Sequence, residues 1–238
     1  TDTYDSSGEV VSISDASAID RGQLELAIRS FQGTIRQVPP MFSALKQEGK
    51  RLYELARAGI AVERKTRTVE VREITLVDWS PPLATVEVRC GRGMYMRSLA
   101  HDLGQELECG AHLRSLVRFQ TGRFSLFDAL TLEELEHLAE SGDWTAALHP
   151  IDAAVYDLKA VIVGRSVEYL ISHGTAVNLG PSAGVGSEGD MCRAYGVDGR
   201  FLAILRAHRD AGVWHPESAT GPRGSPVERA IYFLILMP

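Results

Sequence analysis

The sequence has little cysteine and no long apolar run. Its 238 residues include three cysteines, Cys90, Cys109 and Cys192, and none lies close to another in the chain. That number and spacing exclude a disulfide framework and a CxxC metal knuckle, so we expect reduced thiols. No apolar run approaches the length of a bilayer span and no charged-then-apolar leader follows Thr1. We therefore expect a cytoplasmic protein with no membrane contact.

The motifs of several common enzyme classes are also missing. The chain contains no Gly-x-Ser-x-Gly elbow, because the one match to that pattern, at 180–184, is not set in a predicted strand-to-helix unit. Its histidines are scattered, and no metal-ligand spacing occurs. The glycine-rich stretch 180–189 lacks a following Gly-Lys-Ser/Thr, so it is interpreted as a linker rather than a phosphate loop. These absences argue against metal hydrolysis and serine chemistry, and we expect neither a metal nor a cofactor.

Positive charge is concentrated in two segments of an acidic chain. The net charge is -6, which argues against indiscriminate binding of nucleic acid. Basic residues nevertheless outnumber acidic ones by four between Lys46 and Arg72, and by three between Arg89 and Arg123. Charge alone leaves two interpretations open, solvated helix faces or a local contact with phosphate groups.

The pattern of apolar residues, glycine and proline predicts an α+β fold. Expected helices cover residues 21–31, 51–58, 96–107 and 166–173, with another opening at the capping box of Thr131. Expected strands cover residues 9–12, 66–77, 84–90, 160–163, 191–195 and 201–205. The strands predict a mixed sheet with helices on its faces, followed by a small β-rich domain.

These elements suggest three parts of the chain. We expect a larger domain over residues 1–148, with a basic insertion at about 36–66, and a small β-rich domain over 149–220. The remaining segment, 221–238, resembles neither, and its apolar end is too short for a membrane span and more like a stray strand or an abnormal terminus.

The densest group of chemically useful side chains lies at Gly93 to Arg97, where a glycine bend joins a predicted strand to a predicted helix. Such a bend presents Tyr95 and Arg97 side by side. Taken alone, the pair favours a capping arginine beside a core tyrosine over an aromatic and a fixed cation in a binding site.

Four blocks of sequence make a specific resemblance. Residues 1–8 read TDTYDSSG, residues 38–59 include VPPMFSALK and GKRLYELARAG, residues 90–100 read CGRGMYMRSLA, and residues 109–116 read CGAHLRSL. In order and content they resemble the TDTxDxxG, RNA-gripping, CxxGTYIRSL and CGAHLxxL motifs of TruB-type tRNA pseudouridine synthases. Met94 stands where that family usually has threonine.

The resemblance implies a fold, a reaction and a set of site residues. It implies a pseudouridine-synthase sheet and a PUA-like C-terminal domain, in an enzyme that flips a T-loop uridine, attacks it with an aspartate and rejoins the rotated base through carbon. In that family the reaction needs no cofactor or metal. Arg97 would hold the nucleophile, Asp5 would fix Arg97, and Tyr95 and Leu116 would wall the base pocket. The residues implied to contact RNA are Ser43, Lys46, Lys50, Arg51, Tyr53, Arg57 and His112. The implied partner is the T-arm of tRNA, bound by a monomer without guide RNA.

One motif of the family does not occur in this sequence. The nucleophile of the family lies in Gly-x-Leu-Asp-Pro, which is absent from residues 1–238, and neither Asp5 nor Asp102 occupies an equivalent position. We therefore expect a fragment that binds RNA weakly and catalyses nothing alone. Two other hypotheses remain: a noncatalytic RNA-binding relative, and the catalytic subunit of a guide-RNA-dependent particle. The insertion favours the stand-alone bacterial form over the latter.

Overall fold

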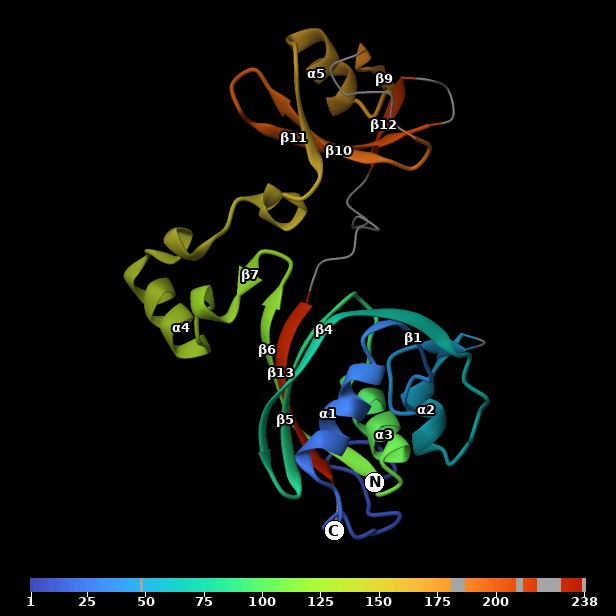
Figure 1. Ribbon diagram of the computed structural model, residues 1–238. Coiled ribbons are helices and arrows are strands. Elements are labelled where there is room, and N and C mark those ends of the chain that lie inside the picture. Colours follow the sequence, from blue (N-terminus) through green and yellow to red (C-terminus); the bar gives the residue numbers. More distant parts are fainter. Residues whose placement is uncertain (48, 181–186, 209–211, 218–227, 237–238) are drawn as a thin grey trace. The chain divides into compact units, whose positions relative to one another are not determined.

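The computed structural model describes residues 1–47, 49–180, 187–208, 212–217 and 228–236, the last range by its backbone. The chain forms two compact units (Figure 1). One comprises Thr1–Ala129 with Ser225–Pro238, and the other comprises Leu130–Gly224. The domain boundaries inferred from the sequence, at residues 148 and 220, remain predictions.

The first unit is built on a six-stranded sheet in the order β1-β4-β5-β13-β6-β7. Its strands are β1 (Gly33–Gln37), β4 (Arg67–Ser80), β5 (Leu83–Cys90), β13 (Glu228–Leu236), β6 (Ala111–Thr121) and β7 (Phe124–Ser125). Each named strand is antiparallel to its neighbours. The sheet is therefore antiparallel where a mixed one was predicted, with a single parallel bridge between Asp5 and Leu113.

The C-terminal strand β13 occupies the middle of this sheet (Figure 1, red). Its residue Ala230 lies opposite Val88 of β5 on one side and Arg118 of β6 on the other. The tail was predicted to be a stray strand or an abnormal terminus, and within residues 228–236 it forms a strand. Its central position satisfies the backbone groups of both flanking strands, because β5 and β6 are not paired with each other.

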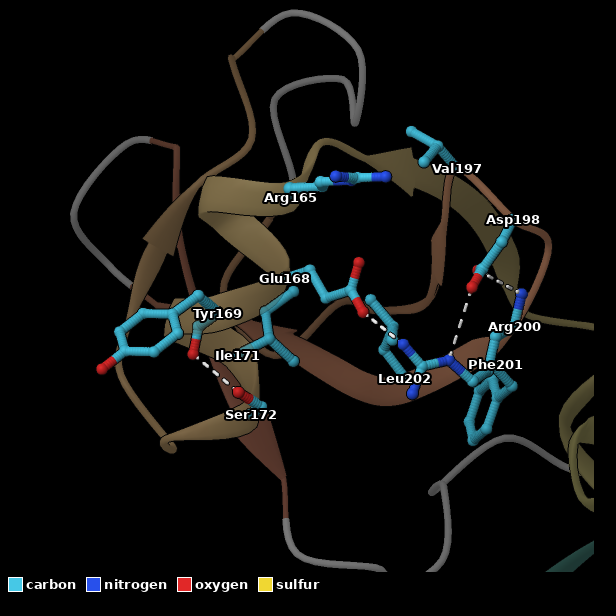
Figure 2. A pocket seen from close by; sticks show the side chains of 10 residues that line it. All are labelled: Arg165, Glu168, Tyr169, Ile171, Ser172, Val197, Asp198, Arg200, Phe201 and Leu202. Carbon is cyan, nitrogen blue, oxygen red and sulfur yellow. Dashed lines mark hydrogen bonds and ion pairs between the residues drawn. The ribbon is translucent and has the colours of Figure 1, made fainter.

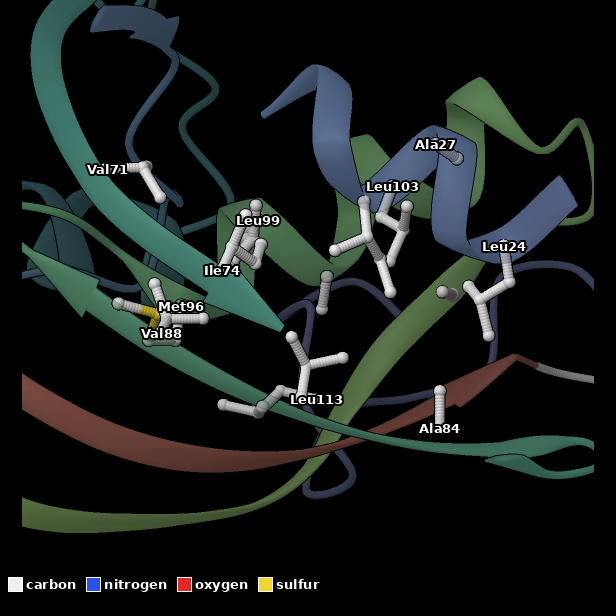
Figure 3. Packing of buried hydrophobic residues seen from close by; sticks show 14 of the residues in the cluster. Leu24, Ala27, Val71, Ile74, Ala84, Val88, Met96, Leu99, Leu103 and Leu113 are labelled. Atoms are coloured by element: carbon white, nitrogen blue, oxygen red, sulfur yellow. The ribbon is translucent and has the colours of Figure 1, made fainter. Parts of the chain in front are cut away.

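Helices α1 (Arg21–Ser30) and α3 (Met96–Glu106) contribute their apolar faces to the core of the first unit (Figure 3). Asp20 is the N-cap of helix α1, and its carboxylate accepts a hydrogen bond from the Gln23 amide in a capping box. Leu24 and Leu103 are fully buried, as the 3.6-residue period of both helices requires. This core fixes the position of the start of α3, where Tyr95 and Arg97 lie.

A close approach at Gly104 joins α3 to the sheet. A Cβ atom at Gly104 would lie 2.1 Å from the backbone nitrogen of Ala111 and 2.3 Å from the carbonyl carbon of Gly110. Those are backbone atoms at the start of β6, so they cannot turn aside as a flexible side chain would. Glycine is therefore required at this position for α3 to pack where it does.

The second unit has a smaller, five-stranded sheet in the order β8-β10-β11-β12-β9. Its strands are β8 (Lys159–Val163), β9 (Val177–Asn178), β10 (Met191–Gly196), β11 (Phe201–Ala207) and β12 (Val213–Glu217). Here β10 pairs in parallel with β8, so this sheet is mixed. Among the described residues, helices α4 (Leu132–Ser141) and α5 (Arg165–Ser172) and the 3-10 turns Trp144–Ala147 and Ile151–Val155 complete the unit. A further 3-10 turn, Leu126–Asp128, belongs to the first unit.

The α+β class is confirmed, as are the main predicted helices and strands, including the helix opened by Thr131. The strand predicted at residues 9–12 is wrong, because this segment has no neighbouring strand and leaves Val11 71% exposed. The linker predicted at 180–189 falls partly, at 181–186, outside the described residues. The sequence did not predict strands β1, β6, β9 and β12, nor the two-residue strands β7, β2 (Lys46–Gln47) and β3 (Lys50–Arg51).

The packing of α3 predicts opposite effects for two glycine-to-alanine changes. We expect Gly104→Ala to lower the free energy of unfolding by about 1–3 kcal/mol, because its methyl group overlaps backbone atoms. The matched control, Gly22→Ala on the exposed face of α1, meets only the carboxylate of Asp20 at 3.2 Å, and should be neutral or stabilising. Thermal unfolding of both variants measures the difference, and a Gly104→Ala protein as stable as the parent would contradict the account.

Candidate active site

The loop of residues 1–8 folds into a tight turn that presents Asp5. A Cβ at Gly8 would lie 2.1 Å from the Thr3 hydroxyl oxygen, so glycine allows the loop to close on itself. Tyr4 adopts a left-handed backbone conformation (φ 63°), and its ring stacks on His101 of α3 with the ring centroids 3.9 Å apart. Stacking of this kind stabilises a backbone conformation that is otherwise unfavourable.

Asp5 is held by both of its carboxylate oxygens. Oδ1 accepts hydrogen bonds from the Thr3 hydroxyl (3.0 Å), the Ser7 amide (3.0 Å) and the Ser7 hydroxyl (2.5 Å). Oδ2 faces the Nη1 atom of Arg97 at 3.3 Å. Burial alone would raise the pKa of Asp5, but the bonds from Ser7 and Thr3, together with the Arg97 guanidinium, outweigh it and lower that pKa. Asp5 is therefore a fixed anion at neutral pH.

Arg97 lies at the second residue of α3 and connects three segments of chain. Its Nη1 donates to the carbonyl of Thr3 (3.3 Å) and to Asp5, and its Nη2 donates to the carbonyl of Phe42 (2.7 Å). These three bonds use three of the five N–H groups of a guanidinium, so two remain for another acceptor. With 25% of the side chain exposed, the cation is oriented by the protein yet accessible.

These side chains line a cavity of about 490 Å³. The loop around Asp5, the turn before α3 and the start of β6 contribute its walls. Arg97, Arg114 and Arg118 supply three positive charges against the single carboxylate of Asp5. A mainly cationic cavity of this size is suited to a nucleotide, since its phosphate is attracted and its base has space to enter.

All four side chains inferred to be catalytic line this same cavity: Asp5, Tyr95, Arg97 and Leu116. Tyr95 is partly buried at the N-cap of α3, and Leu116 is 46% exposed on β6. Met94, the departure from the family motif, lines the cavity too, between exposed Gly93 (φ 82°) and Tyr95. The structure brings these residues together, while their catalytic roles remain a prediction.

Sequence reasoning missed two kinds of residue at this site. Thr3 and Ser7 stand within the TDTYDSSG motif, where their hydroxyl groups gave a signal that could have been used. Gln37, at the end of β1, is bonded to both backbone groups of Tyr95, but nothing near it in the sequence reveals a partner 58 residues away.

The basic insertion forms a short hairpin and helix. Its elements are β2 (Lys46–Gln47), β3 (Lys50–Arg51) and α2 (Leu52–Arg57). The guanidinium carbons of Arg51 and Arg57 lie 5.8 Å and 5.6 Å from the centroid of the Tyr53 ring, within the range of cation–π attraction. Lys46 and Lys50 are exposed and opposed to Arg51 and Gln47 in the hairpin. The insertion thus presents a compact basic and aromatic surface.

Two of the residues inferred to contact RNA are buried instead of exposed. Ser43 is 4% exposed and His112 is 5% exposed. The Ser43 hydroxyl and the His112 Nδ1 atom have no hydrogen-bond partner among the described residues. Neither side chain offers a surface to RNA in this conformation, and their inferred role remains a prediction.

A larger cavity, about 690 Å³, lies in the second unit between α5 and the β10–β11 hairpin (Figure 2). Its central charges neutralise one another, because Arg200 pairs with Glu168 at 2.5 Å and with Asp198 at 3.7 Å. Its lining residues lie between Arg165 and Leu202, and none belongs to the four sequence blocks described above. The chemistry therefore favours the smaller, cationic cavity as the candidate active site.

Among the described residues, no group of three or more His, Cys, Asp or Glu side chains is arranged to hold a metal ion. No helix in the described part of the chain is long and apolar enough to cross a membrane.

Two family models match the chain in succession. Residues 1–96 match "TruB family pseudouridylate synthase (N terminal domain)", and residues 97–156 match "tRNA pseudouridylate synthase B C-terminal domain". Together they cover the cavity described above and place the chain in a class of sequences, the families named after pseudouridylate synthases.

Proteins of similar sequence identify the family within this class. A protein of Symbiobacterium thermophilum called tRNA pseudouridine synthase B is 47% identical over 179 residues, and its namesake in Dehalococcoides mccartyi is 37% identical over 216 residues. The matches cover 74% and 91% of this chain, and 58% and 70% of the respective relatives. This chain belongs to the TruB family. It spans between about one half and three quarters of the length of those relatives.

Solved structures show the same fold at lower identity. A chain in "Crystal Structure of a Cbf5-Nop10-Gar1 Complex" superimposes with a TM-score of 0.65 and 24% identity, over 87% of this chain and 64% of that one. A chain in "Structure of H/ACA RNP bound to a substrate RNA containing 2'-deoxyuridine" gives 0.62 at 21% identity, over 86% and 62% of the two chains. At these identities the likeness concerns the fold alone.

The hydrogen bonds to the Asp5 carboxylate predict a pH-dependent effect of Asp5→Asn. Folding lowers the Asp5 pKa below its ordinary value of 3.8, so the charged group stabilises the fold above that pH, and this contribution is lost as the pH falls through the folded-state pKa. We expect Asp5→Asn to reduce the free energy of unfolding by about 1–3 kcal/mol at neutral pH. In urea titrations the loss should shrink as the solution is acidified; a loss that stays constant would contradict the assignment.

For Asp102 the pH dependence of the free energy of unfolding has the opposite sign to that for Asp5. Burial on α3 raises the pKa of this carboxyl to about 6, and no hydrogen bond or ion pair from the described residues reaches it. Because the folded state holds the proton more tightly than the unfolded state, stability from this group falls as the pH rises from about 4 to 6.

We therefore expect Asp102→Asn to raise the free energy of unfolding by about 1–2 kcal/mol near pH 7, after allowing for the partial exposure of the side chain. Below pH 4, where the native carboxyl is protonated, the variant and the parent should be equally stable. Urea unfolding at the two pH values provides the test, and a variant less stable than the parent at pH 7 would show that Asp102 has a favourable partner.

Proposed function

We propose that this chain forms most of an enzyme that isomerises a uridine in the T-loop of tRNA to pseudouridine. The observation that supports it most directly is that Asp5, Tyr95, Arg97 and Leu116 line one cationic cavity. Membership of the TruB family and the names of the relatives point to the same reaction.

Arg97 has the role of holding the attacking carboxylate. A carboxylate nucleophile must stay ionised and aimed, and a guanidinium achieves both through paired, charge-assisted hydrogen bonds. Arg97 has two N–H groups left after its bonds to Thr3, Asp5 and Phe42. Those two groups suffice for one further carboxylate at the cavity.

Asp5 acts as a support for Arg97 and not as the nucleophile. Its Oδ1 already accepts three hydrogen bonds, and its Oδ2 faces the guanidinium. A carboxylate so fully engaged is a poor nucleophile, because attack would require breaking these bonds. Asp102 lies outside the cavity lining. The nucleophile therefore comes from a Gly-x-Leu-Asp-Pro segment that is not part of residues 1–238, and the chain alone is inactive.

The remaining walls of the cavity accept the flipped base. Removing a uridine from the loop costs a few kcal/mol of stacking, which aromatic and apolar walls offset. Tyr95, Leu116 and Met94 provide such walls. An aromatic ring on one side and aliphatic groups on the other would sandwich the uracil ring.

The RNA backbone is held by the basic insertion. Lys46, Lys50, Arg51 and Arg57 would contact phosphate groups of the T-arm, and contacts of this kind position RNA without reading its sequence. The Tyr53 ring lies within cation–π range of both Arg51 and Arg57. Ser43 and His112 are assigned to the same RNA contact, which requires their side chains, buried in this conformation, to become accessible. The second unit acts as a PUA-like RNA-binding domain. The enzyme works in the cytoplasm as a monomer, without guide RNA, cofactor or membrane contact.

The test uses the complete native protein, whatever lies beyond Thr1 and Pro238, and a T-arm RNA substrate. We expect Arg97→Lys to lower the single-turnover rate of pseudouridine formation by about a hundredfold or more, because lysine cannot make the paired bonds. The affinity for T-arm RNA should change by less than about fivefold. The control is Arg29→Lys, an exposed arginine on α1 whose change should leave both quantities unaltered.

Near-normal turnover by Arg97→Lys would contradict the role given to Arg97. A complete protein that binds T-arm RNA tightly yet forms no pseudouridine would instead support a noncatalytic RNA-binding module.

A further inference from the structure

Gln37 is a polar side chain buried in the core at the end of β1. Only 2% of the residue is exposed, which places it among the largest fully buried side chains of the described chain. Burying a primary amide is unfavourable unless both its donor and its acceptor find partners. The partners that Gln37 has found therefore indicate what keeps it there.

Both partners belong to one residue of the candidate active site. The Gln37 Oε1 atom accepts a hydrogen bond from the Tyr95 amide (2.8 Å), and its Nε2 donates to the Tyr95 carbonyl (3.0 Å). The side-chain amide thereby imitates a neighbouring β-strand, holding the peptide groups on both sides of one α-carbon. Such a pair of bonds fixes the orientation of the Tyr95 backbone and so the direction in which its side chain leaves.

The backbone at Tyr95 needs this support because the turn before it is open. Gly93 is exposed with a left-handed backbone, and an added Cβ there would meet nothing within 4 Å. Tyr95 is the N-cap of α3 and makes no side-chain capping bond. One residue beyond Gln37, the carbonyl of Val38 accepts the Ser98 hydroxyl at 2.7 Å, which joins the same strand end to the first turn of α3.

We propose that Gln37 is a positioning residue that acts through Tyr95. It sets the aromatic wall of the cavity against the flipped base, so its removal slows the chemical step more than it weakens RNA binding. The proposal rests on the pseudouridine-forming function proposed above. It assigns to Gln37 a role distinct from the grip of the basic insertion, because Gln37 is inaccessible to RNA.

The first experiment compares Gln37→Met with Gln32→Met in the complete native protein. Methionine keeps the length of glutamine and removes both hydrogen bonds. The Gln32 side chain is exposed and makes one hydrogen bond to the described residues, to the carbonyl of Arg72 at 3.2 Å, which makes it a matched control. We expect Gln37→Met to lower kcat by about tenfold or more with KM changed by less than about threefold, and Gln32→Met to change neither.

A double-mutant cycle separates positioning from general destabilisation. If Gln37 acts through Tyr95, the loss of kcat on changing Gln37 to Met disappears in a Tyr95→Leu background. Equal losses in the two backgrounds would overturn the proposal, as would a folded Gln37→Met protein with unchanged kcat.

Amide hydrogen exchange gives a readout that does not depend on activity. The Tyr95 amide should exchange about tenfold faster or more in Gln37→Met, while the Leu99 amide, bonded to the Tyr95 carbonyl within α3, should exchange at its original rate. Unchanged exchange at Tyr95 would overturn the clamp itself. If the parent protein forms no pseudouridine, while Gln37→Met shows the predicted faster exchange at Tyr95, the proposed function is refuted and the role of Gln37 in holding the Tyr95 backbone is not.

Discussion

The arrangement of the site depends on one guanidinium group. Arg97 joins the loop of Asp5, the segment ending at Phe42 and the start of α3, through three hydrogen bonds to residues 55 to 94 positions away. The first two of these segments are irregular, and their bonds to Arg97 hold them against the start of α3. Held to a common, rigid donor they form the mainly cationic wall of a cavity, and the same donor retains two N–H groups for a ligand.

Arg97 can hold these segments only because α3 is itself fixed. The helix packs its apolar face against the sheet, and Gly104 lets it approach β6 to a distance that no other residue allows. At its other end, the Gln37 amide holds the Tyr95 backbone. The position of the cation is therefore set by packing at one end of the helix and by buried hydrogen bonds at the other, which is how a partly exposed side chain keeps one orientation.

Sequence patterns predicted the parts of this structure that are set locally. The helix period found α1 and α3, and the ordered motifs grouped Asp5 with Arg97. Long-range choices escaped prediction. Nothing in residues 228–236 states that they pair between β5 and β6, and Gln37 resembles any surface glutamine until its partner is known. At Val11 the sequence predicted a strand that the structure does not contain, because a β-branched residue forms a strand only where a neighbouring strand pairs with it.

The coupling between Arg97 and Asp5 tests the central claim most directly. A double-mutant cycle with Arg97→Met and Asp5→Asn, followed by urea unfolding at neutral pH, measures the free energy that the two side chains share. The account predicts a coupling of about 1 kcal/mol or more, because both groups are mostly buried and bonded to each other. Additive losses, within about 0.3 kcal/mol, would show that the two segments are held independently and would contradict it.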